Sequence, residues 1–128
     1  MTGGVLVDTS VWVDHFRRRN EALVNLLTLD LALTHPMIVT ELACGTPPGP
    51  RSRTLGDIAT LPQTKQASLN EVRELIEREQ LFGRGCGLVD LALLASALLT
   101  PRAQLWTQDK RLVQLAQRFQ IAYEPVRH

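Results

Sequence analysis

The apolar run Val5-Leu6-Val7 constrains this chain most, because it shows no alternation of apolar and polar residues and ends abruptly at Asp8. A strand whose side chains are buried on both faces gives such a run, and strands of this kind occur in parallel sheets covered by helices. A helical pattern follows directly, with Thr9 or Ser10 as its expected N-cap. The run therefore predicts a strand that passes straight into a helix.

The alternation of strand and helix patterns continues along the chain. Further short strands are expected at 31–34 and 104–106, with weaker candidates at 63–67 and 121–123. Helices are expected at 9–19, 20–29, 36–45, 51–60, 69–81, 88–99 and 109–119. Strands that alternate with helices favour a three-layer α/β/α sandwich with a mostly parallel central sheet.

Length and composition favour a single domain that spans residues 1–128. Hydrophobic residues make up 45% of the chain and charged residues 21%, so it can bury a core and is neither disordered nor collagen-like. The proline-rich segment 46–50 is expected to be a rigid turn, because too little chain precedes it for an independent core. Cys44 and Cys86 form no CxxC pair, which argues against a zinc site or a disulfide scaffold. Cys44 is expected to be a small core residue.

Two features bear on localisation. The apolar tract at 91–99 is less than half of the roughly 20 residues that a transmembrane helix needs. The first residues, Met1-Thr2-Gly3-Gly4, lack the basic and hydrophobic layout of a signal peptide. We therefore expect a soluble, cytoplasmic protein with reduced thiols.

Four acidic residues stand at unusual places: Asp8, Glu41, Asp90 and Asp109. Asp8 and Asp109 each follow a predicted strand, and the carboxyl ends of parallel strands meet at one edge of a sheet. Glu41 and Asp90 can reach that edge from flanking helices. Clustered carboxylates repel one another, and a hard divalent cation offsets this repulsion. The pattern predicts a Mg²⁺ or Mn²⁺ site.

Each acid also has a purely structural interpretation. Asp8, Asp90 and Asp109 could be helix caps or acids of a first helical turn, which the helix dipole favours. Glu41 is harder to explain in this way, because it lies within an apolar helix where a buried, unpaired charge would be costly. The four acids together favour a functional site.

Four segments, in order, carry a family resemblance. They are Val5 to Trp12 with its Asp8-Thr9-Ser10 motif, the helix around Glu41, the stretch Gly87 to Ala95 around Asp90, and Thr107 to Leu112. With these segments the chain resembles PIN-domain proteins, specifically VapC-type toxins of bacterial toxin-antitoxin pairs. The resemblance covers nearly the whole chain but is only an outline match over 46–81.

The resemblance implies an endoribonuclease in which Mg²⁺ or Mn²⁺ activates a water for in-line attack on phosphorus. It assigns Asp8 and Asp90 as direct metal ligands, Glu41 as a ligand or an orienting group, and Asp109 as a weaker or second-metal ligand. Supporting roles are expected for Thr9, Ser10 and Thr107. An RNA substrate, a cognate antitoxin protein and a homodimer are implied as partners.

The basic residues add a prediction about RNA. Twelve of the 14 basic residues are arginines, and the chain without its four site acids has 14 basic against 9 acidic residues. Arginine suits phosphate contacts, so candidate RNA-binding residues are Arg17, Arg18, Arg19, Arg84 and Arg111. Solvated helix ends explain these arginines equally well.

Two other functions stay open at this point. A magnesium phosphohydrolase could use Asp8 as a nucleophile on small phosphate esters, although the second acid that such enzymes want two residues later is here Ser10. A noncatalytic α/β binding module is the third possibility. The complete set of four acids argues against it.

Overall fold

A computed structural model describes residues 3–125 and has at its centre a small parallel sheet. Its strands are β1 (Val5–Val7), β2 (Ala32–Leu33) and β3 (Gln104–Trp106), in the order β2-β1-β3. Val5 pairs with Ala32 on one side of β1 and with Gln104 on the other. The first strand is thus the central one, and all three residues of β1 are buried, as its apolar run predicts.

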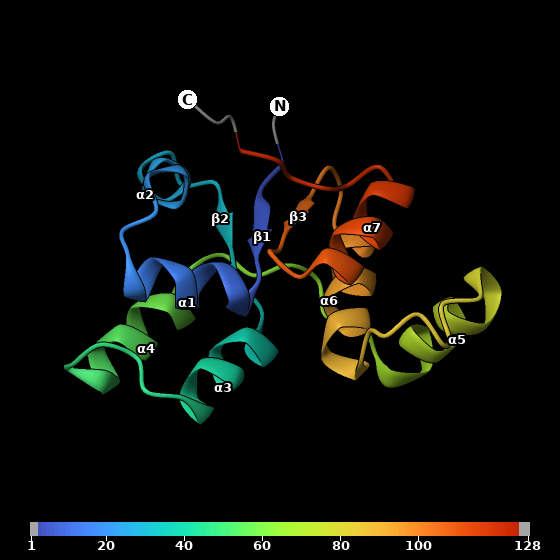
Figure 1. The fold of residues 1–128 in the computed structure, drawn as a ribbon, viewed down its shortest axis with the longest axis horizontal. Coiled ribbons are helices and arrows are strands. Elements are labelled where there is room, and N and C mark those ends of the chain that lie inside the picture. Colours follow the sequence, from blue (N-terminus) through green and yellow to red (C-terminus); the bar gives the residue numbers. More distant parts are fainter. Residues whose placement is uncertain (1–2, 126–128) are drawn as a thin grey trace.

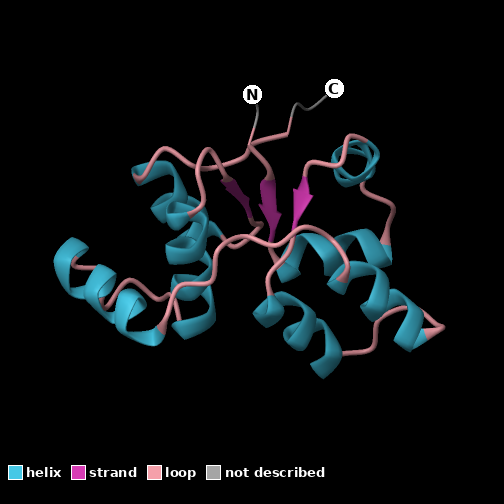
Figure 2. Ribbon diagram, turned by 180° about the vertical axis from the view of Figure 1, so that it is seen from behind, coloured by secondary structure: helices cyan, strands magenta, loops and turns pink. Residues whose placement is uncertain are grey.

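Helices flank the sheet on both sides (Figure 1), and the view from behind shows the same arrangement (Figure 2). One group consists of α1 (Thr9–Arg17), α2 (Glu21–Thr28), α3 (Pro36–Cys44) and α4 (Arg51–Ala59). The other consists of α5 (Leu69–Glu79), α6 (Leu88–Leu99) and α7 (Lys110–Arg118). The predicted three-layer α/β/α fold with a parallel sheet is confirmed.

Helix α6 supplies much of the core. Seven consecutive residues from Leu91 to Ala97 are buried, because this helix is apolar almost all round and packs between α5 and β3. Its one buried hydroxyl, on Ser96, accepts the backbone N–H of Ala67 at 3.0 Å. No helix within residues 3–125 is long and apolar enough to cross a membrane.

The structure corrects some local predictions. The weak strand candidates at 63–67 and 121–123 form only single bridges, Thr34 with Gln63 and Leu105 with Ala122. Asp8, rather than Thr9 or Ser10, is the N-cap residue of α1, and no side chain closes that cap. Cys44 is exposed rather than part of the core, because it is the last residue of α3.

Candidate active site at the carboxyl end of the sheet

Asp8 lies at the centre of the site. It directly follows the central strand, and its backbone N–H donates to the carbonyl of Trp106 in β3 at 2.9 Å. Its side chain is buried, and Oδ2 accepts hydrogen bonds from the hydroxyls of Ser10 and Thr107, both at 2.8 Å. These bonds fix the carboxylate and explain why it does not cap α1.

Thr107 and Asp109 follow β3 at the same edge of the sheet. The Thr107 hydroxyl accepts the backbone N–H of Asp109 at 3.1 Å while it donates to Asp8. Asp109 is exposed and caps α7, since its Oδ1 accepts the backbone N–H groups of Arg111 and Leu112 at 2.9 and 3.1 Å. Asp109 therefore has the structural role of a helix cap. Its Oδ2 takes part in neither of these two capping bonds.

Glu41 reaches the site from α3. The expectation that it is a buried charge is wrong, because it is exposed while its neighbour Leu42 faces the core. Its Oε1 accepts a 2.7 Å hydrogen bond from the hydroxyl of Thr9, the first residue of α1. This bond orients Glu41 toward the end of β1, where Asp8 lies.

Asp90 lies in the first turn of α6, where its Oδ2 accepts the backbone N–H of Gly87 at 3.4 Å. Burial raises the pKa of the Asp90 carboxyl, and the negative charges of Asp8, Asp109 and Glu41 raise it further, against the opposite effect of the Gly87 hydrogen bond. All four predicted acids therefore contribute to one negative region.

The donor chemistry of this region fits a hard divalent cation. The converging groups are carboxylates and hydroxyls, which suit Mg²⁺ or Mn²⁺, and a cation would offset the repulsion on Asp90. Within residues 3–125, however, no three His, Cys, Asp or Glu side chains lie close enough together to hold a metal ion. The acids share one edge without forming a complete ligand set as they stand.

The predicted arginines lie on two sides of the candidate site. On the α1 side, Arg17 lines a cavity beside Glu41, whereas Arg19 donates to Glu21 at 2.7 Å and Arg18 caps the end of α1. On the α7 side, Arg111 donates to the carbonyl of Gly85 at 3.3 Å, in the glycine-rich turn before α6. Arg84 of the same turn is exposed, and its Nε donates to the carbonyl of Gln80 at 3.4 Å.

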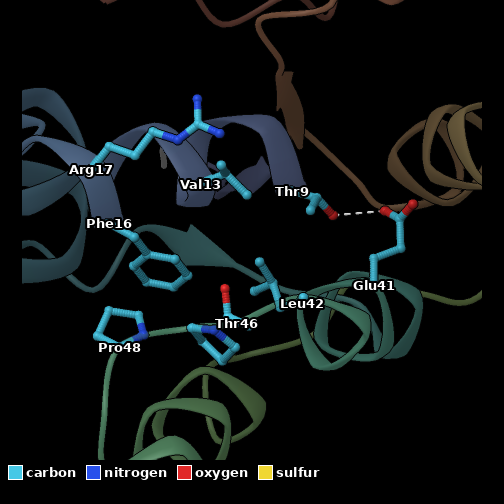
Figure 3. Close-up of a pocket in the computed structure, with 10 residues that line it drawn as sticks. Thr9, Val13, Phe16, Arg17, Glu41, Leu42, Thr46 and Pro48 are labelled. Atoms are coloured by element: carbon cyan, nitrogen blue, oxygen red, sulfur yellow. Dashed lines mark hydrogen bonds between the residues drawn. The ribbon is translucent and has the colours of Figure 1, made fainter.

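The cavity beside Glu41 was not predicted from the sequence (Figure 3). Its volume is about 580 Å³, and it extends from Thr9 and Glu41 to Phe16 and Pro48. The spacing of Thr9, Val13, Phe16 and Arg17 places these residues on one face of a helix. That spacing is a signal in the sequence, but the opposite wall comes from a loop whose position only the fold shows.

Comparison with known proteins agrees with the predicted resemblance. No protein-family model matches the chain. It is 45% identical over 108 residues to Ribonuclease VapC32 of Mycobacterium tuberculosis, in strains CDC 1551 and H37Rv, and the match covers 84% of this chain and 86% of the relative. The chain therefore belongs to the VapC family of PIN-domain proteins.

Proposed function

We propose that this protein is an endoribonuclease that hydrolyses phosphodiester bonds of RNA with Mg²⁺ or Mn²⁺ and acts as the toxin of a toxin-antitoxin pair. The observation that carries the proposal is the meeting of acidic side chains at the carboxyl end of the sheet, where the hydroxyl of Thr107 joins the buried carboxylate of Asp8 to the backbone of Asp109. The relative, Ribonuclease VapC32, is a ribonuclease by name, and it aligns with 84% of this chain.

Asp8 and Asp90 are the proposed direct metal ligands, Glu41 a ligand or orienting group, and Asp109 a weaker ligand. A bound ion would supply the activation of water for attack on phosphorus and would offset the charge that develops on the phosphate. Asp109 remains an acceptable member because its Oδ2 takes no part in capping α7.

The hydroxyls of Ser10 and Thr107 position Asp8 for this role. Both donate to Oδ2, and within residues 3–125 no hydrogen bond to Oδ1 is found. We infer that Oδ1 is the oxygen that serves the reaction, while Oδ2 anchors the side chain. Thr9 anchors the side chain of Glu41 in the same way, because its hydroxyl donates to Oε1 rather than to Oε2.

The alternative of a phosphohydrolase with Asp8 as nucleophile is less well supported. The residue two positions later is Ser10, and its hydroxyl donates to Asp8 rather than supplying a second carboxylate. A noncatalytic module leaves the repulsion among the four acids unexplained.

The activity test compares the purified protein with three variants on single-stranded RNA. We expect cleavage in Mg²⁺ or Mn²⁺, none in excess EDTA, and a loss of several orders of magnitude in Asp8→Asn and in Asp90→Asn. Glu77→Gln, which removes one exposed charge on α5, is the matched control and keeps full activity. Full cleavage in EDTA, or in either site variant, overturns the proposal.

The toxin role has a separate test in living cells. Expression of the wild-type chain in a bacterial host is expected to arrest growth, and co-expression of a cognate antitoxin, expected to cover the acidic site, to relieve it. Asp8→Asn is the control that should be harmless. Harmless expression of a protein that cleaves RNA at high turnover in vitro would overturn the toxin role and leave the nuclease intact.

A further inference from the structure

The cavity beside Glu41 is continuous with the candidate active site. Thr9 and Glu41, which share the 2.7 Å hydrogen bond, line one end of it. Phe16 and Arg17 lie seven and eight residues further along α1, which is about 12 Å along the axis of a helix. An RNA strand that passes the carboxylates therefore meets this cavity next.

The two walls of the cavity differ in origin but both are fixed. One wall is a single face of α1, and the other is the end of α3 with the loop that follows it (Figure 3). The guanidinium of Arg51 donates to the carbonyls of Ala43 and Gly45, and the hydroxyl of Thr54 donates to the carbonyl of Pro48 at 2.8 Å. These bonds tie the loop to α4, so the cavity has a preformed shape.

The lining contains one aromatic ring, on which a flat group can stack, and one cationic side chain. The Phe16 ring and Pro48 lie close together at one end of the cavity, and the exposed side chain of Arg17 extends from the next position of α1, away from this pair (Figure 3). Within residues 3–125, the guanidinium of Arg17 makes no hydrogen bond or ion pair. Single-stranded RNA is recognised by this combination, because unpaired bases stack on aromatic rings while cations hold the phosphates.

We propose that this cavity is a nucleotide subsite, in which an unpaired base of the RNA next to the cleaved bond stacks on Phe16 and its phosphate binds Arg17. This inference rests on the proposed nuclease function. The positive charge sets the orientation, because Arg17 attracts a phosphate at the end of the cavity away from Glu41. The volume of about 580 Å³ is in the range of small-ligand sites.

The test for the base uses the inactive Asp8→Asn protein and short single-stranded RNAs that carry the fluorescent base 2-aminopurine at one position at a time. We expect stacking to quench the fluorescence at one position. Phe16→Leu should abolish this quenching and weaken binding about fivefold or more, whereas Phe16→Tyr restores both. Phe119→Leu, the same change at the end of α7, is the control and should change neither.

The test for the phosphate contact uses Arg17, which is exposed and outside the core. Arg17→Met should weaken RNA binding equally for all sequences and lower the slope of log affinity against log salt by about one. Arg17→Lys should keep the slope. Arg73→Met, an exposed arginine on α5, is the control that should leave affinity and slope unchanged.

Each outcome separates the subsite from the nuclease. If the wild-type protein cleaves RNA but the Asp8→Asn protein shows no quenching that depends on Phe16, as when a protein segment fills the cavity instead, the subsite alone is overturned. If the Arg17→Met variant binds RNA with the same affinity and salt slope as Arg73→Met, Arg17 does not bind a phosphate, and the proposed orientation is overturned. Wild-type protein that fails to cleave RNA overturns the proposed function itself.

Discussion

The hydroxyl of Thr107 donates a 2.8 Å hydrogen bond to Oδ2 of Asp8, and so joins the residue that follows β3 to the residue that follows β1. The hydroxyl oxygen of Thr107 also accepts the backbone N–H of Asp109 at 3.1 Å. Thr107 is buried, and 99 residues separate it from Asp8 in sequence. One side chain thus fixes the central acid and the start of α7 together.

Replacement of Thr107 is therefore expected to affect both stability and activity. Thr107→Ala removes a hydrogen bond to a charged acceptor and leaves the Asp109 N–H without its partner, so the free energy of unfolding should fall by about 2 kcal/mol. RNA cleavage should fall about tenfold or more, because Asp8 loses one of its two anchors. Thr107→Ser, which keeps the hydroxyl, should restore most of both.

Urea unfolding and initial rates of RNA cleavage measure these effects. Thr28→Ala is the matched control, since its hydroxyl donates only to the carbonyl of Val24 on an exposed helix surface. That control should change the free energy of unfolding by less than about 0.5 kcal/mol. Equal stability of the Thr107→Ala and Thr28→Ala variants would contradict the anchoring role.

His35 predicts a dependence of stability on pH. Its side chain is buried, its Nδ1 accepts the backbone N–H of Met37 at 3.0 Å, and its Nε2 lies 3.2 Å from the hydroxyl of Ser96. Burial lowers the pKa of His35 from its ordinary 6.5. Below about pH 6.5 the His35 side chain takes up a proton in the unfolded chain but stays neutral in the folded chain. The free energy of unfolding therefore falls as the pH falls.

Chemical denaturation at pH 7.5 and pH 5.5 checks this prediction, with His35→Asn as the reference. Asparagine can cap α3 as His35 does but does not titrate in this range. The wild-type protein should lose more stability on acidification than the variant, by at most about 1.4 kcal/mol per pH unit. A pH dependence that is the same in both proteins would show that His35 is protonated without cost.

Much of the site could be predicted from local patterns. Asp8 and Asp109 follow strands that the apolar runs identify, and the rule that parallel strands end at one edge brings them together. Asp90 lies in the first turn of the most apolar helix, whose burial follows from its sequence. In these cases the position of the acid, after a strand or in a first helical turn, follows from its neighbours in the sequence.

Glu41 shows where local patterns fail. Its apolar neighbours suggest a buried charge, but successive residues of a helix point about 100° apart, and α3 turns Ile38 and Leu42 inward while Glu41 stays exposed. Its contact with Thr9 spans 32 residues. The strand predictions at 63–67 and 121–123 were also wrong, because each of these segments forms only a single bridge.

The contact of Thr9 with Glu41 predicts an effect on activity with little effect on stability. The hydrogen bond is exposed, so Thr9→Val should change the free energy of unfolding by less than about 1 kcal/mol. Cleavage should fall about tenfold, because the carboxylate of Glu41 is no longer held toward the other acids. Thr9→Ser should restore the rate.

Thr40→Val is the control for this change. Thr40 precedes Glu41 on α3, and its hydroxyl donates to the carbonyl of Pro36 rather than to the site. Cleavage rates of both variants at saturating Mg²⁺ make the comparison. If Thr9→Val and Thr40→Val cleave RNA equally well, the hydroxyl of Thr9 does not position Glu41 for the reaction.

The proposed metal site predicts a reversal in the melting temperatures of wild type and Asp90→Asn. Because burial and three neighbouring negative charges raise the pKa of Asp90, its ionised form destabilises the metal-free fold at neutral pH. Asp90→Asn should therefore melt above wild type in EDTA, and the difference should shrink as the pH falls and the wild-type carboxyl takes up its proton. Asparagine keeps an oxygen that can accept from Gly87 in the first turn of α6.

Mg²⁺ should narrow or reverse this order. An ion that binds only the folded state adds about 2.7 kcal/mol of stability at a concentration a hundred times its Kd, and the variant forfeits much of this gain if Asp90 is a ligand. Paired melts of both proteins, in EDTA and in Mg²⁺, measure the difference without any RNA. If Mg²⁺ raises both melting temperatures equally, Asp90 is an acid of a first helical turn and not a metal ligand.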